Sequence, residues 1–221
     1  MRDVIAAVGK CTLLPRVDGT HFSHLLRNIV YQQLSGRVAG VIHGRLLSIL
    51  DMSVREDADS RLSVSEAPPE LSSDESAVHL RTAAAQAARV LATSEDDLRT
   101  CGLSTAKIRA IHDLARRVTD QRLPLDRFAQ MSDEAIIEAL VAVRGIGPWT
   151  AQMFLMFRLG RPDVLPVLDL GVRKGAQRIY RMRKLPDAAR LEKVARKWHP
   201  WASVASWYCW RALDIDNNGN W

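Results

Sequence analysis

Residues 140–174, LVAVRGIGPWTAQMFLMFRLGRPDVLPVLDLGVRK, constrain the fold of this chain more than any other stretch. An apolar helical pattern ends in a glycine hairpin. A second helix is predicted to begin at Pro148, because proline suits the first helical position, where the backbone N–H has no partner. A loop then leads to a lone carboxylate, Asp169, at the predicted start of a third helix. The stretch therefore predicts helices joined by short connections, with one acid at a helix start.

Gly145 and Gly147 bracket Ile146 in the hairpin. Glycine adopts positive φ and lets another backbone come close, while Ile146 is expected to turn inward and anchor the turn. The N–H groups at the start of the following helix, with the positive end of its dipole, favour an anion. No Lys-Ser or Lys-Thr follows the second glycine, so this is not a nucleotide P-loop. From the glycines alone, an ordinary packing hairpin is an equally good interpretation.

Helical periodicity extends along most of the chain, and strand alternation is absent. Three apolar stripes carry the pattern: Phe22, Leu25, Leu26, Ile29 and Val30; Val38, Val41, Ile42 and Leu46; and Ile108, Ile111, Leu114, Ala115 and Val118. The sequence therefore predicts an all-α fold of about ten short helices.

Local signals mark where several helices begin and end. Ser94 with Asp97 has the spacing of a capping box, and Ser104 and Ser132 are predicted N-caps. Gly102 and Gly160 stand where helices should stop. Residues 61–75, rich in proline and serine, are predicted to form a long loop, and residues 216–220 a loose tail.

Composition excludes several classes of protein. The chain has 31 Lys+Arg against 25 Asp+Glu and a pI near 9.6, which favours a polyanionic partner. Three separated cysteines make no disulfide framework and too few ligands for a four-cysteine iron–sulfur cluster. His21 and His24 can share a helix face, but no third ligand has metal spacing. No apolar run reaches membrane length, and the first residues lack a signal-peptide pattern.

Four segments, in order, resemble one family. They are IVYQQLSGRVAGVIHGRLL (residues 29–47), LRTCGLSTAKIRAIHDLARRV (98–118), the hairpin with PDVLPVLDLGV (162–172), and PWASVASWYCWRAL (200–213). Together they resemble the helix-hairpin-helix DNA glycosylases, and most closely the AlkA-type 3-methyladenine DNA glycosylases II. The resemblance implies one glycosylase module over residues 1–221, a two-lobed helical bundle with the active cleft between the lobes. Lobe A would be about 1–20 plus 150–221, and lobe B about 21–149. The additional N-terminal β-rich domain of larger relatives is not expected.

The family's catalytic aspartate matches Asp169. A carboxylate beside the sugar stabilises the positive charge that develops when the glycosidic bond breaks, and it can activate water. Capping of the following helix is the alternative role, and the two roles are compatible. Many relatives have a second acid directly before this aspartate, where Leu168 stands here.

The resemblance also implies a pocket for the extruded base. Relatives that also cut the DNA backbone have a lysine nucleophile where Trp149 stands, so this chain is expected to release the base without lyase activity. The base-stacking tryptophan falls on Trp210, with Trp149 and Tyr208 as further candidates, and Met153 stands where one relative has a pocket tyrosine. An aromatic pocket suits a cationic alkylated purine, although core packing is the alternative for this tryptophan-rich end.

DNA contacts are expected at two places. The residue that fills the gap left by the flipped base comes from Gln32, Gln33 and Leu34; the sequence leaves Gln33 and Leu34 as alternatives, with Ser35 and Arg37 contacting phosphate nearby. At the hairpin, phosphate would be bound by residues Gly145, Ile146, Gly147, Trp149 and Thr150. By resemblance, main-chain carbonyls of Val141, Val143 and Ile146 hold a structural Na⁺ or K⁺.

These features predict a monofunctional, monomeric glycosylase that acts on 3-methyladenine and 7-methylguanine in double-stranded DNA. We expect no required cofactor, no iron–sulfur cluster and no membrane association. The expected location is the bacterial cytoplasm at the nucleoid, or the nucleus in a eukaryote. The alternatives are a non-catalytic DNA-binding module and a glycosylase for other damaged bases. A bifunctional glycosylase/lyase is disfavoured by Trp149.

Overall fold

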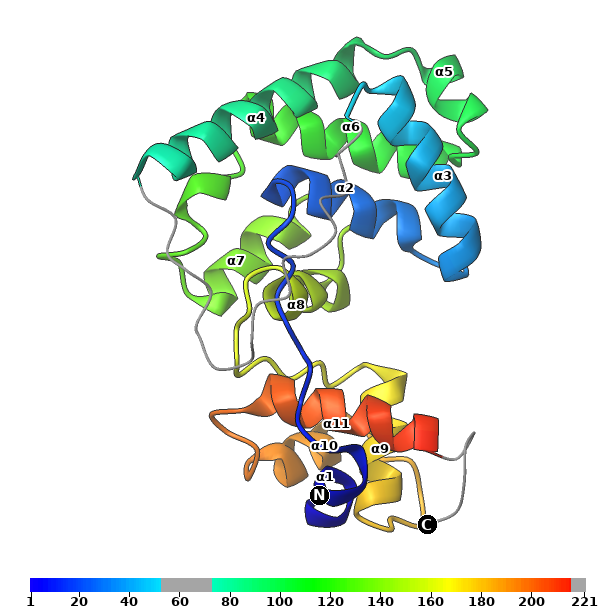
Figure 1. Cartoon of the computed structure of the whole chain (residues 1–221), viewed down its shortest axis with the longest axis vertical. Coiled ribbons are helices and arrows are strands. Elements are labelled where there is room, and N and C mark those ends of the chain that lie inside the picture. Colours follow the sequence, from blue (N-terminus) through cyan, green and yellow to red (C-terminus); the bar gives the residue numbers. More distant parts are fainter. Residues whose placement is uncertain (53–72, 216–221) are drawn as a thin grey trace. The chain divides into compact units, whose positions relative to one another are not determined.

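The computed structural model describes residues 1–52 and 73–215, and within these ranges it contains helices and no strand, as predicted (Figure 1). The helices are, in chain order, α1 (Arg2–Val8), α2 (His21–Tyr31), α3 (Gly36–Ile49), α4 (Ser73–Ala92), α5 (Glu95–Thr100), α6 (Thr105–Thr119), the 3-10 helix η1 (Leu125–Arg127), α7 (Asp133–Val141), α8 (Pro148–Phe157), α9 (Leu170–Ile179), α10 (Ala188–Ala195) and α11 (Ala202–Asp214).

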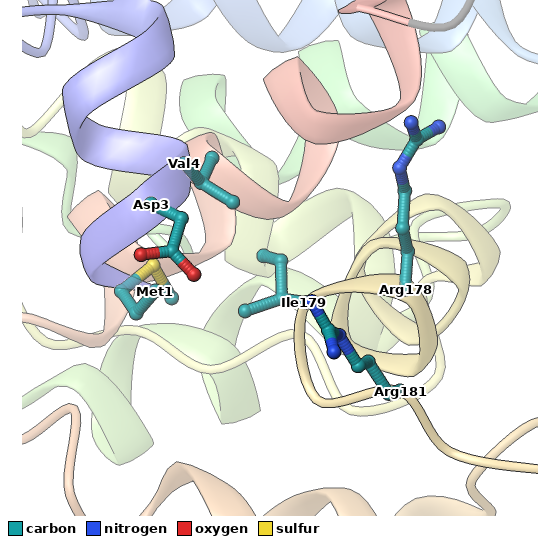
Figure 2. A pocket seen from close by; sticks show the side chains of 6 residues that line it. All are labelled: Met1, Asp3, Val4, Arg178, Ile179 and Arg181. Atoms are coloured by element: carbon teal, nitrogen blue, oxygen red, sulfur yellow. The ribbon is translucent and has the colours of Figure 1, made fainter. Parts of the chain in front are cut away.

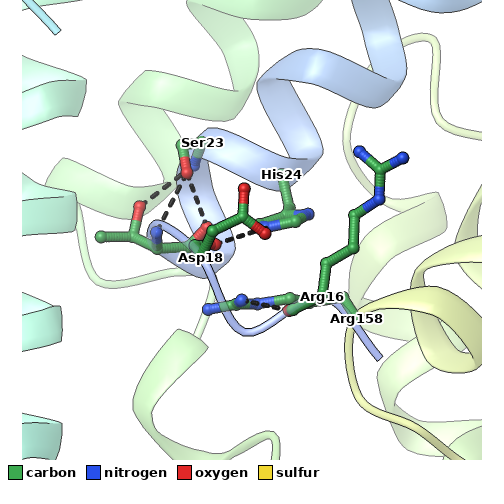
Figure 3. Close-up of polar contacts among 6 residues, drawn as sticks. Arg16, Asp18, Ser23, His24 and Arg158 are labelled. Atoms are coloured by element: carbon green, nitrogen blue, oxygen red, sulfur yellow. Dashed lines mark hydrogen bonds and ion pairs between the residues drawn. The ribbon is translucent and has the colours of Figure 1, made fainter. Parts of the chain in front are cut away.

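The predicted serine caps begin their helices. Ser94, Ser104 and Ser132 each accept a hydrogen bond from the backbone N–H three residues later, at 3.1, 3.4 and 3.3 Å. At α5, Ser94 Oγ also donates to the carboxylate of Asp97 (2.7 Å). A reciprocal capping box occurs at the start of α2, where the side chains of Thr20 and Ser23 each accept from the other's backbone N–H (Figure 3). These bonds satisfy N–H groups that the helix itself leaves unpaired.

The predicted helix stops are confirmed at both glycines. Gly102 has φ +96° after α5, and Gly160 has φ +65° after α8. Beyond α8, the N–H of Arg161 donates to the carbonyl of Leu155 at 3.0 Å, which closes the helix end. Most of the loop predicted at residues 61–75 lies outside the described residues, and residues 73–75 belong to α4 instead. The tail predicted at residues 216–220 also lies outside them.

The described chain divides into two compact units. Residues 1–16 and 155–215 form the first unit, and residues 17–52 and 73–154 form the second. The boundary between them falls within α8. Among the described residues, no helix is both long and apolar enough to cross a membrane.

The core of the second unit lies among α2, α4 and α6, with α4 running alongside α6 (Figure 1). The predicted stripe on α2 is completely buried, and so is the stripe on α6 apart from its last residue, Val118, which is 7% exposed. Removal of such a side chain from water contributes about 1.5–3 kcal/mol. The 3.6-residue period of these two stripes therefore identified the faces that the fold buries.

The apolar stripe on α3 lies on a helix, as its spacing predicts, but only part of it is buried. Leu46 is buried, but Val38 and Val41 are 48% and 52% exposed. Only Ala39 and Leu46 are buried on this helix, which packs mainly against α2. An amphipathic pattern shows which residues share a face, but it does not show whether another element covers that face.

The first unit is built around a close crossing of α9 and α11 (Figure 1). A Cβ added at Gly175 would lie 2.1 Å from the main-chain oxygen of Cys209, so the two backbones meet with no side chain between them. Val172 and Ala176 of α9 are completely buried in the same apolar cluster as Leu191 of α10. Glycine at this position is required by the close approach of another backbone.

The N-terminal helix packs on the other side of α11. Tyr208 is buried in a cluster with Val4 of α1 and Ala212, and its hydroxyl donates to the carbonyl of Gly9 at 2.8 Å. Residues 1–16 and the last described helix thus belong to one unit, although they lie at opposite ends of the described sequence.

Candidate active site and nucleic-acid interface

Asp169 is the N-cap of α9, as its position in the sequence predicts. Its Oδ1 accepts a hydrogen bond from the N–H of Val172 at 2.7 Å. The Asp169 N–H in turn donates to the carbonyl of Pro166 at 2.9 Å, which fixes the approach of the chain to the helix. The side chain remains partly exposed. The capping role is therefore real, and it holds the carboxylate in one orientation at the start of the helix.

Trp210 of α11 supplies a second bond to the same oxygen. Its indole Nε1–H donates to Asp169 Oδ1 at 2.9 Å. One face of the indole stacks on Phe157, with ring centroids 5.8 Å apart and an interplanar angle of 21°. The tryptophan that the sequence assigned to base stacking therefore also orients the candidate catalytic carboxylate, and this contact was not foreseen.

Two glycines of α9 allow this contact. A Cβ at Gly171 would lie 2.6 Å from Cδ1 of Trp210 and 3.1 Å from Oδ1 of Asp169, so any side chain there would displace the indole. Gly175, one turn later, brings α11 close enough for the indole to reach. Glycines four residues apart share a helix face. That spacing in LGVRKGA was the sequence signal for the crossing, and the sequence prediction missed it.

The neighbours of Trp210 on α11 face elsewhere. Tyr208 lies two residues, or about 200°, around the helix, and it bonds to Gly9. The structure therefore does not bring Tyr208 to Asp169, contrary to its predicted place in a base pocket. Burial raises the pKa of the Cys209 thiol to about 12, and the negative charge of Asp169 acts in the same direction. The surroundings of Cys209 are thus poorly solvated.

The hairpin between α7 and α8 has the predicted anchor. Ile146 is 3% exposed, and its N–H donates to the carbonyl of Val143 at 3.1 Å. Gly145 has φ +78°, and a Cβ there would lie 3.0 Å from the Cβ of Ala110. A Cβ at Gly147 would meet nothing within 4 Å. Gly145 is thus required by the fold, whereas the space at Gly147 is open.

Side chains of α6 brace the hairpin. The Asp113 carboxylate accepts from the N–H of Arg144 at 2.8 Å and from Nε of Arg117 at 2.9 Å. Burial acts to raise the pKa of Asp113, but these two hydrogen bonds and the arginine charge outweigh it and hold the pKa below its ordinary value. Asp113 thus stays a carboxylate and keeps its bond to the hairpin backbone.

The side chains of the turn Gln32-Gln33-Leu34 do not all point into solvent, where DNA could be contacted. Gln32 points at the hairpin, where its Nε2 donates to the Gly145 carbonyl (2.9 Å) and to Oγ1 of Thr150 (3.2 Å). Gln33, with φ +57°, and Leu34 are both exposed, so they remain the two candidates for insertion into DNA. Sequence reasoning placed Gln32 in the DNA-contacting set but did not foresee its bonds to the hairpin.

The remaining predicted residues have clear positions. Ser35 caps α3 by accepting from the N–H of Val38 at 3.5 Å, and Arg37 is exposed on the first turn of that helix. Trp149 is 45% exposed at the start of α8, while Thr150 beside it is buried. Met153, one turn further along α8, is half-buried. All of these residues belong to the second unit.

Two arginines of the first unit donate hydrogen bonds to main-chain carbonyls. Arg158 donates to the carbonyl of Arg16, and Arg173 Nε donates to that of Pro186 at 2.7 Å (Figure 3 shows the former). Within residues 1–52 and 73–215, no group of three or more His, Cys, Asp or Glu could hold a metal ion. His24 bonds instead to the carbonyl of Asp18 (Figure 3).

A pocket lies away from Asp169. It is lined by residues at the start of the chain and at the C-terminal end of α9 and just beyond it, namely Met1, Asp3, Val4, Arg178, Ile179 and Arg181 (Figure 2). Asp169 caps the opposite end of α9, and a helix of ten residues is about 15 Å long. The pocket is therefore separate from the carboxylate.

The fold and these elements define a class: helical proteins that carry a helix-hairpin-helix motif followed by an aspartate at a helix start. Residues 26–200 match the family described as HhH-GPD superfamily base excision DNA repair protein, and the chain belongs to this family. It is homologous to 3-methyladenine DNA glycosylases, including those of the AlkA type.

Individual proteins that are similar in sequence or fold have names of the same kind. The chain is 34% identical to DNA-3-methyladenine glycosylase 1 of Schizosaccharomyces pombe over 119 residues, which is 53% of this chain and 52% of the relative. The chain thus spans about half the length of that relative. A Bacillus halodurans structure called DNA-3-methyladenine glycosidase has 28% identity and a TM-score of 0.75, covering 98% of this chain and 86% of that one.

A DNA complex shares the fold. The structure of Schizosaccharomyces pombe 3-methyladenine DNA glycosylase Mag1 with abasic DNA has a TM-score of 0.72 at 23% identity, covering 99% of this chain and 93% of that one. At this identity the likeness concerns the fold alone. The predicted all-α glycosylase fold is therefore confirmed.

Proposed function

We propose that this chain is a monofunctional DNA glycosylase that removes alkylated bases, such as 3-methyladenine and 7-methylguanine, from double-stranded DNA. The observation that carries the proposal is the orientation of Asp169. Its Oδ1 is held by both the Val172 N–H and the Trp210 indole, in a chain of the base excision repair family. The named relatives are 3-methyladenine DNA glycosylases, which favours the same substrates here.

The reaction follows from the chemistry of the carboxylate. A paired base cannot be reached inside the duplex, so the nucleotide must first be extruded. An alkylated purine already carries a positive charge; the bond from its nitrogen to C1′ breaks, and the base leaves neutral with the electron pair. Asp169 stabilises the sugar cation, and water adds to C1′ while it gives a proton to the carboxylate. An abasic site remains.

The strand itself stays intact in this mechanism. A lyase reaction needs an amine to form a Schiff base with C1′. Trp149, at the position of the family's lysine, has no such group, although its exposure at the start of α8 suits a base-contacting role. With borohydride, we expect no covalent complex, and strand breakage should require hot alkali.

We assign the two compact units to the two lobes of the glycosylase. In the first unit, Trp210 would stack on the damaged base, and in the second unit Trp149 and Met153 are the candidates for base contact. Since Phe157 covers one face of the Trp210 indole, a base would stack on the other face. Tyr208 is left out, because its hydroxyl and ring pack against the N-terminal segment.

The hairpin would hold the DNA backbone. Open space at Gly147 and the N-terminal amides of α8 suit a phosphate. Main-chain carbonyls of Val141, Val143 and Ile146 offer neutral oxygens at the C-terminal side of α7, a donor type that suits Na⁺ or K⁺. Such an ion would add positive charge beside the phosphate, without any part in the chemistry. Gln33 or Leu34 would fill the gap left by the base. We expect a monomer that acts at the nucleoid or in a nucleus.

A panel of duplexes, each with one defined lesion, tests the proposal. Single-turnover release of 3-methyladenine and 7-methylguanine is expected, with slower release of neutral lesions such as hypoxanthine. Binding to every duplex without release of any base would instead support a non-catalytic DNA-binding module. Release of oxidised bases alone would assign the chain to a different glycosylase activity.

A further inference from the structure

One face of α6 contacts both DNA-binding elements of the second unit. Lys107, Ala110 and Asp113 follow one another at three-residue spacing, so they lie along one face of the helix. Lys107 bonds to the end of α2, Ala110 lies against Gly145, and Asp113 bonds to the backbone of Arg144. The turn after α2 and the hairpin therefore both contact the same helix, α6.

Lys107 fixes the chain where α2 ends. Its ammonium donates to the carbonyls of Val30 (2.6 Å) and Gln32 (2.9 Å), which the helix end leaves without intrahelical partners. Lys107 is partly buried, and this burial lowers the pKa of its ammonium group. The Gln32 carbonyl that accepts this bond directly precedes Gln33, the exposed residue with positive φ.

Gln32 joins the two elements directly. Its carbonyl is held by Lys107, while its side chain donates to the Gly145 carbonyl and to Thr150. The bonded groups are 113 and 118 residues away along the chain. A glutamine bonded in this way transmits a shift of the hairpin to the turn, and the reverse, because neither bond can be kept if one element moves alone.

We propose that Gln32 and the Lys107–Ala110–Asp113 face of α6 make the hairpin and the turn at residues 33–35 one rigid DNA-reading element. Phosphate binding at the hairpin and insertion of the turn are then energetically coupled. Gln32 is a positioning residue that does not itself enter the DNA. This inference rests on the proposed function only in that both elements meet DNA; it requires no base release.

A double-mutant cycle measures the coupling. Gly147→Asp weakens the hairpin, and Gln33→Gly with Leu34→Ala truncates the turn; each is measured by affinity for a duplex with a tetrahydrofuran abasic analogue. With Gln32 intact, the combined variant should bind at least about 3-fold more tightly than the product of the separate losses predicts. In a Gln32→Met background the losses should simply multiply. Gln32→Asn, too short to reach the hairpin, should act like Gln32→Met.

Gln86→Met is the matched control. Gln86 accepts a hydrogen bond from Thr20 at 2.6 Å and thus also joins distant segments of the second unit, but away from the hairpin. The coupling should survive this change. Additive losses with Gln32 intact, coupling that persists in both Gln32 variants, or equal loss of coupling in Gln86→Met would each overturn the proposal.

Hydrogen exchange in the free protein gives a test that does not depend on DNA. Gln32→Met should raise amide exchange at residues 145–147 and at residues 33–35 together, whereas Gln86→Met should raise neither. Faster exchange in only one of the two segments would refute a common element. Because this measurement needs neither binding nor catalysis, a chain that released no base would contradict the proposed function and leave this result standing.

Discussion

The α9–α11 crossing of the first unit and the hairpin region of the second position their functional groups by opposite means. At the crossing, two helix backbones meet at Gly175, and the proposed functional group is a side chain, Asp169, held by Trp210. At the hairpin, the proposed functional groups are main-chain amides, and side chains from α2 and α6 bond to the loop. The difference fits the tasks: a reacting atom needs one carboxylate at a fixed distance, whereas a phosphate is bound without regard to sequence.

Replacement of the carboxylate should give the largest effect. Asp169→Asn should reduce base release by about 10²- to 10⁴-fold, while affinity for duplex DNA stays the same or rises slightly, because a negative charge near phosphates is lost. Single-turnover release and fluorescence anisotropy measure the two quantities. Asp187→Asn is the control, since Asp187 caps α10 through the same kind of bond, from Arg190 N–H at 2.8 Å. Similar losses in both variants would mean that Asp169 only caps a helix.

Glycine substitutions test the contrast in packing. Gly175→Ala should lower the free energy of unfolding by about 1–3 kcal/mol or more, because the new Cβ meets backbone that cannot move aside. Gly147→Ala should change it by less than about 0.5 kcal/mol, because the added Cβ meets nothing. Urea denaturation measures both. Equal costs at the two positions would contradict the contrast between a packed crossing and an open hairpin.

Trp210→Phe separates orientation from stacking. Phenylalanine keeps an aromatic ring against Phe157 but has no N–H for Asp169. A hydrogen bond to a charged group contributes about 1.5–3 kcal/mol, so Tm should fall and kcat should fall by roughly 10-fold or more, with KM nearly unchanged. Trp207→Phe, on the same helix, should leave kcat as it is. A rise in KM with normal kcat would show that Trp210 binds the base and does not orient the acid.

Charge at the hairpin should act on binding alone. Gly147→Asp is expected to weaken binding to damaged and undamaged duplexes alike, by roughly 3- to 10-fold at moderate salt, and to reduce the salt dependence of the affinity. The single-turnover rate at saturating protein should remain near normal. A loss confined to damaged DNA would place the hairpin in the lesion pocket and remove the distinction between the two regions.

One effect is confined to alkaline pH, namely destabilisation through Cys209. Its pKa rises from 9.0 to about 12 in the fold, so the folded protein holds the thiol proton more tightly than the unfolded chain. Stability from this group is complete below pH 9 and decreases as pH rises from 9 towards 12, by up to about 1.4 kcal/mol per pH unit. Cys209→Ala should remove this contribution in urea denaturation at pH 8 and 10. If the free energy of unfolding falls as much between pH 8 and pH 10 in Cys209→Ala as in the unsubstituted protein, the crossing is more hydrated than its packing implies.

Several residues have contacts that the sequence analysis did not foresee, for a common physical reason. Tyr208 and Trp210 were grouped because both are aromatic, yet residues two apart on a helix point in nearly opposite directions. Val38 and Val41 belong to an apolar stripe with helical spacing, yet both are exposed, because nothing in an amphipathic pattern shows what covers a helix face. Gln32 was placed with Gln33 and Leu34 in the segment that supplies the inserted residue, and its bond to the hairpin, 113 residues away, could not be read from the sequence.

The sequence by itself determined the helices, their serine and threonine caps, the hairpin and the place of Asp169 at a helix start. These features depend on groups within four residues of one another, so a linear pattern contains them. Only the tertiary structure decided that Trp210, 41 residues away, holds Asp169, and that Gln32 bonds to Gly145 across 113 residues. Such pairs depend on how helix faces pack, and at Asp169 a small residue, Gly171, makes room for the distant indole.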